Sequence, residues 1–264
     1  MALAKKTGDL GMGVFMLQSF SDAAFPALEG WDFWQSTLEE WLRLDLDRRD
    51  HIPLISRRTA FRAARAEDVT ADLADVIGAL ADFEDRDMRV ALREDLARVA
   101  FGAGDLELAR AYLEAAHDLM PENESLFDGL ARVALHQRDP ERLRSLVVEA
   151  RTSPTRHLRF MVSSIAYAEA ALALAEGRQR EALALYRNAA PMLEAAGNRL
   201  ALAWIGLDVL AALPPDDPEV APWLERSREL FGHVGARAWL ARLDASVATA
   251  AARAAAGTTG TVAH

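Results

Sequence analysis

The sequence contains no cysteine and almost no lysine, and both shortages narrow what the protein can be. Among its 264 residues, lysine occurs only at Lys5 and Lys6, so nearly all positive charge is carried by arginine. The lack of cysteine excludes a disulfide framework, a Cys-ligated zinc site, an iron–sulfur cluster and a thiol nucleophile. A chain of this length can bury a sizeable core without such cross-links.

Acidic residues outnumber basic residues. The chain has 30 Lys and Arg against 40 Asp and Glu, which gives a formal net charge of −10 at pH 7. Nucleic-acid binding needs a basic surface, so we expect no direct contact with nucleic acid. The apolar stretch 161–175 is too short to span a bilayer and contains Glu169. No convincing targeting segment is present, and we expect a cytoplasmic protein that does not contact a membrane.

An internal repeat is the most informative feature of the sequence. The five residues 96–100 recur unchanged at 130–134, and Asp105 recurs as Asp139 at the same offset of 34 residues. A fixed spacing of this length is typical of a two-helix solenoid unit.

Turn-forming residues divide the chain into helix-length segments. Turns within helix pairs are predicted at Gly30, Ala66–Glu67, Gly104, Arg138–Asp139, Gly177 and Pro214–Pro215. Breaks between pairs are predicted at Gly8, Asp45–Asp50, Asp82–Asp87, Pro121–Asn123, Ser153–Pro154, Gly197 and Gly235. The intervening segments have a helical period, and no stretch alternates with period two. The sequence therefore predicts an all-α fold of about six antiparallel helix pairs, with a last single helix near 236–255.

Three short motifs predict where helices begin. In Asp139-Pro140-Glu141 and Asp217-Pro218-Glu219, a capping carboxylate precedes a first-turn proline and an acid that the helix dipole favours. Ser153-Pro154 offers a hydroxyl cap in the same arrangement.

The repeat resembles a known family. When Val90 is counted as position one, the signature positions of a tetratricopeptide repeat (TPR) are occupied by Leu96, Ala97, Ala100, Gly104, Ala109, Leu113, Ala116 and Pro121. The next repeat keeps Leu130, Ala131, Ala134 and Ala150, and the unit around Gly177 keeps Ala170, Ala173, Ala182, Tyr186 and Ala189. The chain is also similar to the C-terminal helical repeats of bacterial signalling ATPases, cyclase-like regulators and LuxR-type regulators. This resemblance implies a right-handed α-α superhelix that binds proteins, with a C-terminal capping helix.

The resemblance also sets the expected domain organisation. We expect a single TPR-like solenoid over residues 1–256, followed by a flexible tail at 257–264. Its best-matching repeats lie at 90–196, with irregular repeats at 1–89 and closing repeats at 197–256. Residues 1–8 match the end of a second helix, so we expect the chain to be the C-terminal part of a larger regulator, or a short homologue that lacks the catalytic part.

The TPR register predicts a partner site on the concave side. First-helix positions five and nine, which line the groove in this family, hold Glu94, Arg98, Asp128, Arg132 and Tyr167. Acids and arginines on successive helices can bind a charged peptide segment, and arginine does so with two parallel hydrogen bonds. The alternative is that these residues form ion pairs within the protein, which contribute little when exposed.

Trp31, Trp34 and Trp41 share one predicted helix at i, i+3 and i+10. Tryptophans at this spacing on one helix are typical of core residues that pack against neighbouring helices. The alternative is that they anchor an interface, because tryptophan is enriched at binding hot spots. In that alternative the protein is a structural homo-oligomer that associates through the Trp31 face.

No motif in the sequence specifies catalysis or a cofactor. The acidic runs at 45–50 and 82–87 lack the glycine and terminal glutamate of a calcium loop, and we expect their acids to cap helices. The leading hypothesis is a non-enzymatic interaction, sensor or scaffold module in bacterial signalling or transcription regulation. A metal-assisted hydrolase that uses residues 82–87 is the enzymatic alternative.

Overall fold

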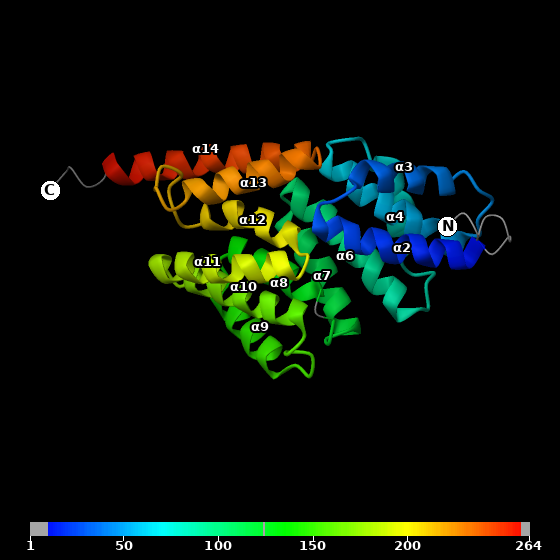
Figure 1. Cartoon of the computed structure of the whole chain (residues 1–264), viewed down its shortest axis with the longest axis horizontal. Coiled ribbons are helices and arrows are strands. Elements are labelled where there is room, and N and C mark those ends of the chain that lie inside the picture. Colours follow the sequence, from blue (N-terminus) through cyan, green and yellow to red (C-terminus); the bar gives the residue numbers. More distant parts are fainter. Residues whose placement is uncertain (1–9, 124, 260–264) are drawn as a thin grey trace. The chain divides into compact units, whose positions relative to one another are not determined.

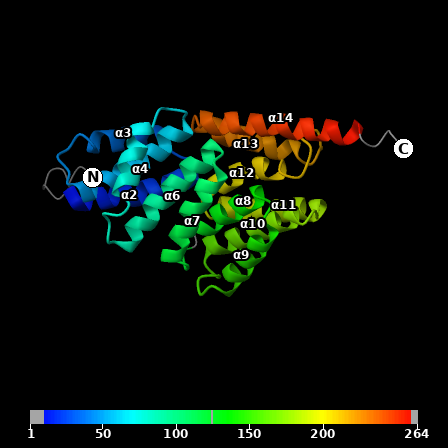
Figure 2. The same ribbon diagram turned by 180° about the vertical axis from the view of Figure 1, so that it is seen from behind.

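The computed structural model describes residues 10–123 and 125–259, and every regular element in these ranges is a helix (Figure 1; Figure 2 shows the opposite side). The prediction of an all-α protein is therefore confirmed. Thirteen helices occur in the described residues, packed in neighbouring pairs such as α6 with α7, α10 with α11, and α12 with α13. Their bounds are α2 Leu10–Ala27, α3 Trp31–Trp41, α4 Arg48–Ala64, α5 Thr70–Ala79, α6 Arg86–Ala103, α7 Leu106–Leu119, α8 Ser125–His136, α9 Pro140–Thr152, α10 Arg159–Ala175, α11 Gln179–Ala195, α12 Arg199–Val209, α13 Ala221–His233 and α14 Arg237–Thr259.

Several helices begin where the sequence predicts. The Asp139 carboxylate accepts a hydrogen bond from the backbone N–H of Arg142 at 2.9 Å, and Pro140 is the first residue of α9. Asp47 and Asp85, one from each acidic run, cap α4 and α6 in the same way. These side chains satisfy backbone donors that the first helical turn leaves without partners.

Two predicted helix starts are displaced. The hydroxyl of Ser153 accepts from the backbone N–H of Thr155 at 3.2 Å, which closes a local turn, and α10 begins only at Arg159. The Asp217 carboxylate likewise accepts from the N–H of Glu219 at 2.8 Å, and α13 begins at Ala221. In both motifs the capping side chain stabilises a turn ahead of the helix, as short polar side chains commonly do.

The repeat spacing is visible in the backbone. Gly104, Arg138 and Gly177 each follow the first helix of a pair and have positive φ angles of 88°, 58° and 76°. A left-handed residue at this place ends a helix and turns the chain back, which glycine does without strain. Gly104 and Arg138 are 34 residues apart, so the structure repeats the interval found in the sequence.

The described residues group into two compact units. The single TPR-like solenoid over 1–256 remains a prediction. The first unit covers residues up to 121 together with 234–238, and the second covers 122–233 and residues from 239 onward. The superhelical path remains a prediction. The predicted tail at 257–264 begins inside α14, which continues to Thr259, and its last five residues lie outside the described part, as do residues 1–9.

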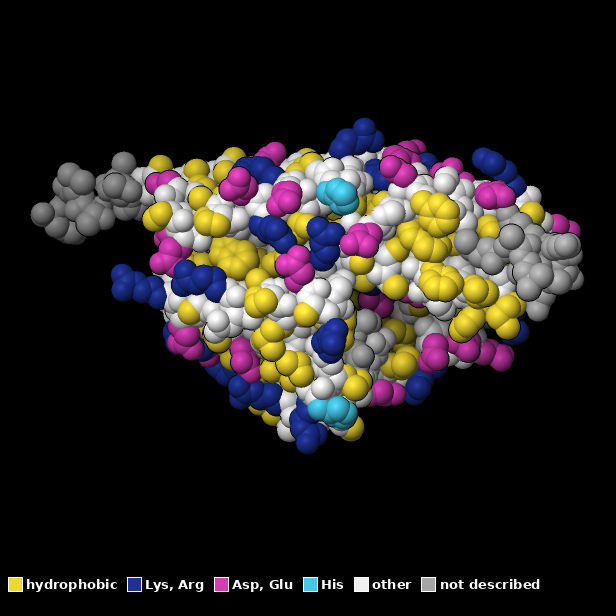
Figure 3. Space-filling view, viewed as in Figure 1, with side chains coloured by type: hydrophobic (Ala, Val, Ile, Leu, Met, Phe, Trp, Pro, Cys, Tyr) yellow, Lys and Arg dark blue, Asp and Glu magenta, His cyan; other side chains and the backbone are white. Residues whose placement is uncertain are grey.

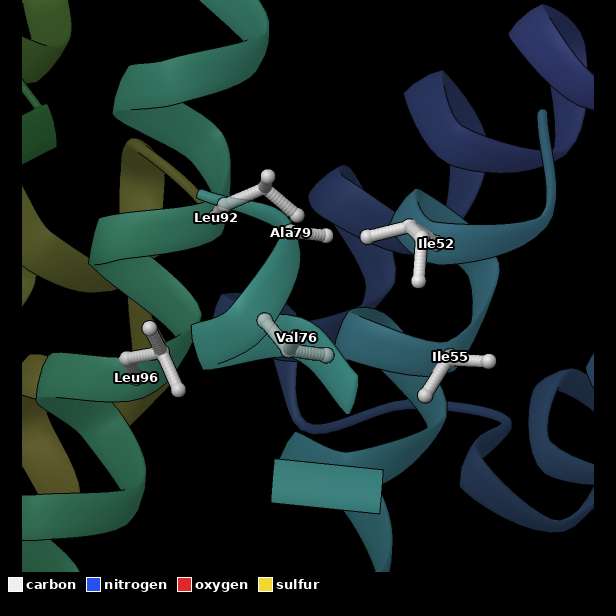
Figure 4. Close-up of a cluster of buried hydrophobic side chains, with 6 residues drawn as sticks. All are labelled: Ile52, Ile55, Val76, Ala79, Leu92 and Leu96. Carbon is white, nitrogen blue, oxygen red and sulfur yellow. The ribbon is translucent and has the colours of Figure 1, made fainter. Parts of the chain in front are cut away.

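Two apolar clusters form the core of the first unit. One joins α4, α5 and α6 through the six side chains drawn in Figure 4: Ile52, Ile55, Val76, Ala79, Leu92 and Leu96. The other joins α2, α3 and α4, where the rings of Phe25, Trp31 and Phe61 pack within 4.9–5.1 Å of one another. Aromatic contacts therefore fix α2 and α3 to α4.

The second unit has an aromatic cluster of its own. Trp204 of α12 packs on Phe231 of α13 at 4.8 Å and on Trp239 of α14 at 5.1 Å between ring centres. Small residues allow close helix packing elsewhere, since Ala170, Ala171 and other alanines of α10 are fully buried. None of the described helices is long and apolar enough to cross a membrane.

Candidate functional site

In the first unit, the charged residues predicted to line a groove form a paired cluster. Arg98 of α6 contacts Asp95 at 2.8 Å and also pairs with Glu94, one turn earlier on the same helix. From α4, Arg57 contacts Asp95 at 3.1 Å. The Arg98 guanidinium also lies 5.1 Å from the centre of the Phe25 ring, a cation–π contact with α2. The side chains of Glu94 and Arg98 are only 15% and 20% exposed.

The pKa shifts of the two arginines reflect this enclosure. Burial lowers the pKa of the Arg57 guanidinium below its ordinary value, although Asp95 opposes the shift. Burial also acts to lower the pKa of Arg98, but Glu94 and Asp95 outweigh it and raise that pKa above its ordinary value. The cluster joins α4 to α6 through the ion pair of Arg57 with Asp95.

In the second unit, the centre of the corresponding cluster is the fully buried Asp208 of α12. Its Oδ2 accepts a hydrogen bond from the Tyr167 hydroxyl at 2.5 Å and lies 3.7 Å from Nε of Arg132. Its Oδ1 lies 3.0 Å from Nε2 of His136. Arg132 and His136 belong to α8 and Tyr167 to α10, so one carboxylate connects three helices.

Arg132 is enclosed by rings as well as by acids. Its guanidinium lies 5.1 Å from the centre of the Tyr167 ring and 5.9 Å from that of Trp204. Burial acts to lower the pKa of Arg132, but Tyr167, Asp208 and Asp128 raise it above its ordinary value. Asp128, which precedes Arg132 by one turn of α8, pairs with the amide side chain that caps α12.

Arg98 and Arg132 occupy the same position of the repeat, and both are held in the interior of their unit by carboxylates and a ring. Tyr167 is fully buried, and the side chains of Glu94, Arg98, Asp128 and Arg132 are at most 20% exposed. The ion pairs that we considered as an alternative are present. The contribution of these five residues to partner recognition remains a prediction.

The largest exposed apolar side chains gather instead on α2 and α3. Met12, Phe15 and Phe20 of α2 are 54%, 65% and 52% exposed, and Phe33 of α3 is 57% exposed. The half-buried Trp34 stacks on Phe20 at 6.2 Å and meets Phe33 edge-on at 5.0 Å between ring centres. Figure 3 shows hydrophobic side chains gathered over these two helices. We call these five residues the α2–α3 aromatic surface.

The sequence of α2 explains why this surface exists. Val14, Leu17 and Phe25 form a stripe at helical spacing that is buried against the rest of the unit. Met12 and Phe15 lie outside that stripe, so α2 has a second apolar side that its own core does not use. A helix that is apolar all round needs cover on more than one side.

The three predicted tryptophans separate into two environments. Trp31 and Trp41 are 2% and 1% exposed and belong to the core, as the favoured interpretation predicts. Trp34 projects toward Phe20 and Phe33 at the surface. The exposure of the three phenylalanines was not predicted, although residues 10–27 have apolar side chains on both faces of the helix, which is a signal for such a surface.

The first unit also contains a cleft. This cleft of about 350 Å³ over α4 and α5 is lined by Leu46, Arg48, His51, Ile52, Ile55 and Asp75. Its Arg48 is paired with Asp82 at 2.9 Å, both side chains being largely exposed. Within residues 10–123 and 125–259, no three His, Asp or Glu side chains are grouped so that they could hold a metal ion.

Comparison with known proteins identifies no family for this chain. No protein-family model matches it, and no curated protein or solved structure is significantly similar to it. The resemblance to tetratricopeptide repeats therefore rests on the residues of this sequence.

Proposed function

We propose that this chain is a non-enzymatic, TPR-like protein-interaction module of a bacterial signalling or transcription-regulatory system. In this proposal it works in the cytoplasm as the C-terminal part of a larger regulator. The α2–α3 aromatic surface docks the partner, which is a protein segment or an effector domain of the same polypeptide. The exposure of Phe15, Phe20 and Phe33 on neighbouring helices carries the proposal, because grouped apolar side chains at a surface mark sites of association.

Burial of these exposed apolar side chains by a partner is energetically favourable. Full burial of a large apolar side chain contributes about 1.5–3 kcal/mol, and each of the three phenylalanines still exposes more than half of its side chain. Trp34 adds an aromatic ring with an indole N–H, a combination that is enriched among interface hot spots.

Ion pairs with α4 hold the two helices that carry the surface in place. Arg57 pairs with Asp22 of α2, and Arg65 pairs with Asp32 of α3 at 2.5 Å. Arg65 also contacts the carbonyl oxygen of Val234 at 3.3 Å, within the same unit. A surface that is held in place before binding loses less conformational entropy when a partner docks.

A partner that docks on this surface regulates an attached effector domain, because its binding is coupled to the state of that domain. If the partner prefers one state of an attached effector domain, binding shifts the equilibrium toward that state by the difference in affinity. The module then needs no bond-making chemistry of its own.

The proposal is tested by partner capture from an extract of the source cells, with cross-linking, using the full chain in three forms. The first is the wild type, and the second is the double variant Phe15→Ser/Phe33→Ser. The third, Leu108→Ser/Val148→Ser, is a matched control that removes apolar side chains 42% and 61% exposed on α7 and α9. We expect capture by the wild type and the control but not by the second form. Equal capture by all three, with unchanged helicity and melting temperature, would refute the proposal.

A further inference from the structure

The cleft over α4 and α5 has an apolar floor and a polar rim. Its volume of about 350 Å³ is at the lower end of the range for sites that bind small molecules. Leu46, Ile52 and Ile55 form the apolar floor, and the two isoleucines also belong to the core cluster drawn in Figure 4. Because that cluster packs α4 against α5 and α6, the floor is fixed before a ligand arrives.

The rim of the cleft has charges of both signs, of which one is unbalanced. Arg48, His51 and Asp75 are its polar side chains. Arg48 pairs with Asp82 at 2.9 Å, so the charge of this arginine is already compensated. Within the described part of the chain, the side chains of Asp75 and His51 have no hydrogen-bond or ionic partner. Asp75 therefore leaves the rim with one uncompensated negative charge.

Asp72, one turn earlier on α5, provides a contrast. Its carboxylate contacts Arg58 at 2.9 Å and Arg62 at 3.1 Å, and its side chain is only 14% exposed. The exposed Asp75 lies on the same helix but lines the cleft. The two nearby arginines of α4 are thus bound to Asp72, and a ligand cation would be the first ionic partner of Asp75.

We propose that this cleft binds a small primary amine with a branched aliphatic body. The ammonium group donates hydrogen bonds to the Asp75 carboxylate and to an unprotonated ring nitrogen of His51, while the aliphatic body covers the apolar floor. The site is separate from the α2–α3 aromatic surface and does not depend on the proposed function. The chain would then sense a small molecule in addition to docking a protein.

The pairing of the rim selects this ligand over its close analogues. A carboxylate of the same shape would face Asp75, and the arginine that could receive it is already paired with Asp82. A neutral alcohol of the same shape would cover the apolar floor but leave the charge of Asp75 without a partner. An amine is the analogue that uses both the floor and the unpaired acid.

The test uses the full chain with carbon-13 labels in the isoleucine δ1 methyl groups. Among the five isoleucines of the sequence, Ile52 and Ile55 line the cleft, whereas Ile165 and Ile205 belong to the second unit and serve as internal references. Isoamylamine, isoamyl alcohol and isovalerate are titrated at pH 7, because they share one aliphatic body and differ in charge. N-acetyl-lysine methylamide represents the lysine side chain of a protein.

We expect isoamylamine to shift the methyl signals of Ile52 and Ile55 and to leave the two reference signals in place. It should bind at least about fivefold more tightly than the alcohol or the carboxylate. Asp75→Asn should reduce its affinity to that of the alcohol. Asp118→Asn removes an exposed acid of α7 outside the cleft, makes the same change in net charge, and should bind isoamylamine like the wild type.

Four results would overturn the inference. These are no shift of the two cleft methyl signals with isoamylamine, equal affinity for the amine and the alcohol, unchanged affinity in Asp75→Asn, or tighter binding of N-acetyl-lysine methylamide than of isoamylamine. The last result would assign the cleft to a lysine side chain of a partner protein. Both variants replace exposed side chains, so circular dichroism should show the wild-type melting temperature for each.

Discussion

The hydroxyl oxygen of Tyr167 lies 2.5 Å from Oδ2 of Asp208, and neither side chain is exposed to solvent. A buried carboxylate depends on such donors, because water cannot replace them. Tyr167→Phe removes this donor and little volume, so it should lower the free energy of unfolding by about 1–3 kcal/mol. Urea denaturation measures the difference.

Tyr186→Phe is the matched control. Tyr186 is equally buried and packs near Tyr167, but its hydroxyl has no hydrogen-bond partner among the described residues. Loss of that hydroxyl should leave stability unchanged or slightly higher. If both variants lost the same stability, the hydrogen bond to Asp208 would not be the cause.

The buried tyrosines also predict how stability depends on alkaline pH. Burial raises the pKa of Tyr167 and Tyr186 well above the ordinary value of 10.0. Above pH 10 the unfolded chain therefore releases phenolic protons that the folded chain retains, which favours unfolding. Their contribution to stability is complete below pH 10 and is lost as the pH rises through the folded pKa values.

Buried arginines act in the opposite direction. Burial lowers the pKa of Arg242 from its ordinary value to about 10, so between its folded and unfolded pKa values the folded chain binds fewer protons than the unfolded chain. Tyrosinate absorbance should rise at higher pH in the folded protein than in urea. A rise near pH 10 with native circular dichroism would contradict this expectation.

Arg132 should be a structural residue of the second unit. Its replacement removes a guanidinium whose Nε lies 3.7 Å from the buried Asp208 carboxylate, so Arg132→Met should lower the free energy of unfolding by about 3–5 kcal/mol. Arg144→Met is the control, because the Arg144 side chain is 45% exposed and its ion pairs with Glu141 and Glu176 should contribute less than about 1 kcal/mol. Thermal and urea unfolding of the two variants are compared. Similar losses would mean that the buried cluster has no special role.

Gly206 permits the close approach of α12 and α13. A Cβ atom at this position would lie 2.8 Å from the carbonyl oxygen of Trp223 and would also meet the hydroxyl of Ser227. Backbone atoms cannot move aside easily, so Gly206→Ala should destabilise the protein by about 1–3 kcal/mol.

Gly78→Ala provides the comparison for Gly206→Ala. No atom lies within 4 Å of a Cβ atom at Gly78 of α5, and alanine is the better helix former by up to about 1 kcal/mol. The melting temperature should fall for Gly206→Ala and be unchanged or higher for Gly78→Ala. The reverse order would show that the α12–α13 contact is looser than described.

Local signals made the helices predictable. A 34-residue interval and turn residues placed Gly104 and Arg138 correctly, and the Asp139 cap marked the start of α9. The prediction of a helix start at Ser153 was wrong, because a serine hydroxyl can stabilise a turn as well as a helix start, and the two motifs look alike in sequence. The choice depends on contacts made elsewhere in the fold.

The candidate site was harder to predict, because it depends on which helices meet. The repeat register located Arg132, but nothing in the sequence pairs it with Asp208, 76 residues later. The register therefore predicted the position of Arg132 in the repeat but not its ion pair with Asp208. In the same way, periodicity predicted a buried stripe in α2 but not that Phe15 and Phe20 would remain uncovered.

Site-specific photo-crosslinking at Phe33 tests the central claim most directly. The full chain is expressed in the source cells with a benzophenone side chain at Phe33, and with the same group at Val148 of α9 as a control. The account predicts an adduct from Phe33 alone, to a segment of a partner protein or of an effector domain. No adduct, the same adducts from both positions, or an adduct to a second copy of this chain would contradict it.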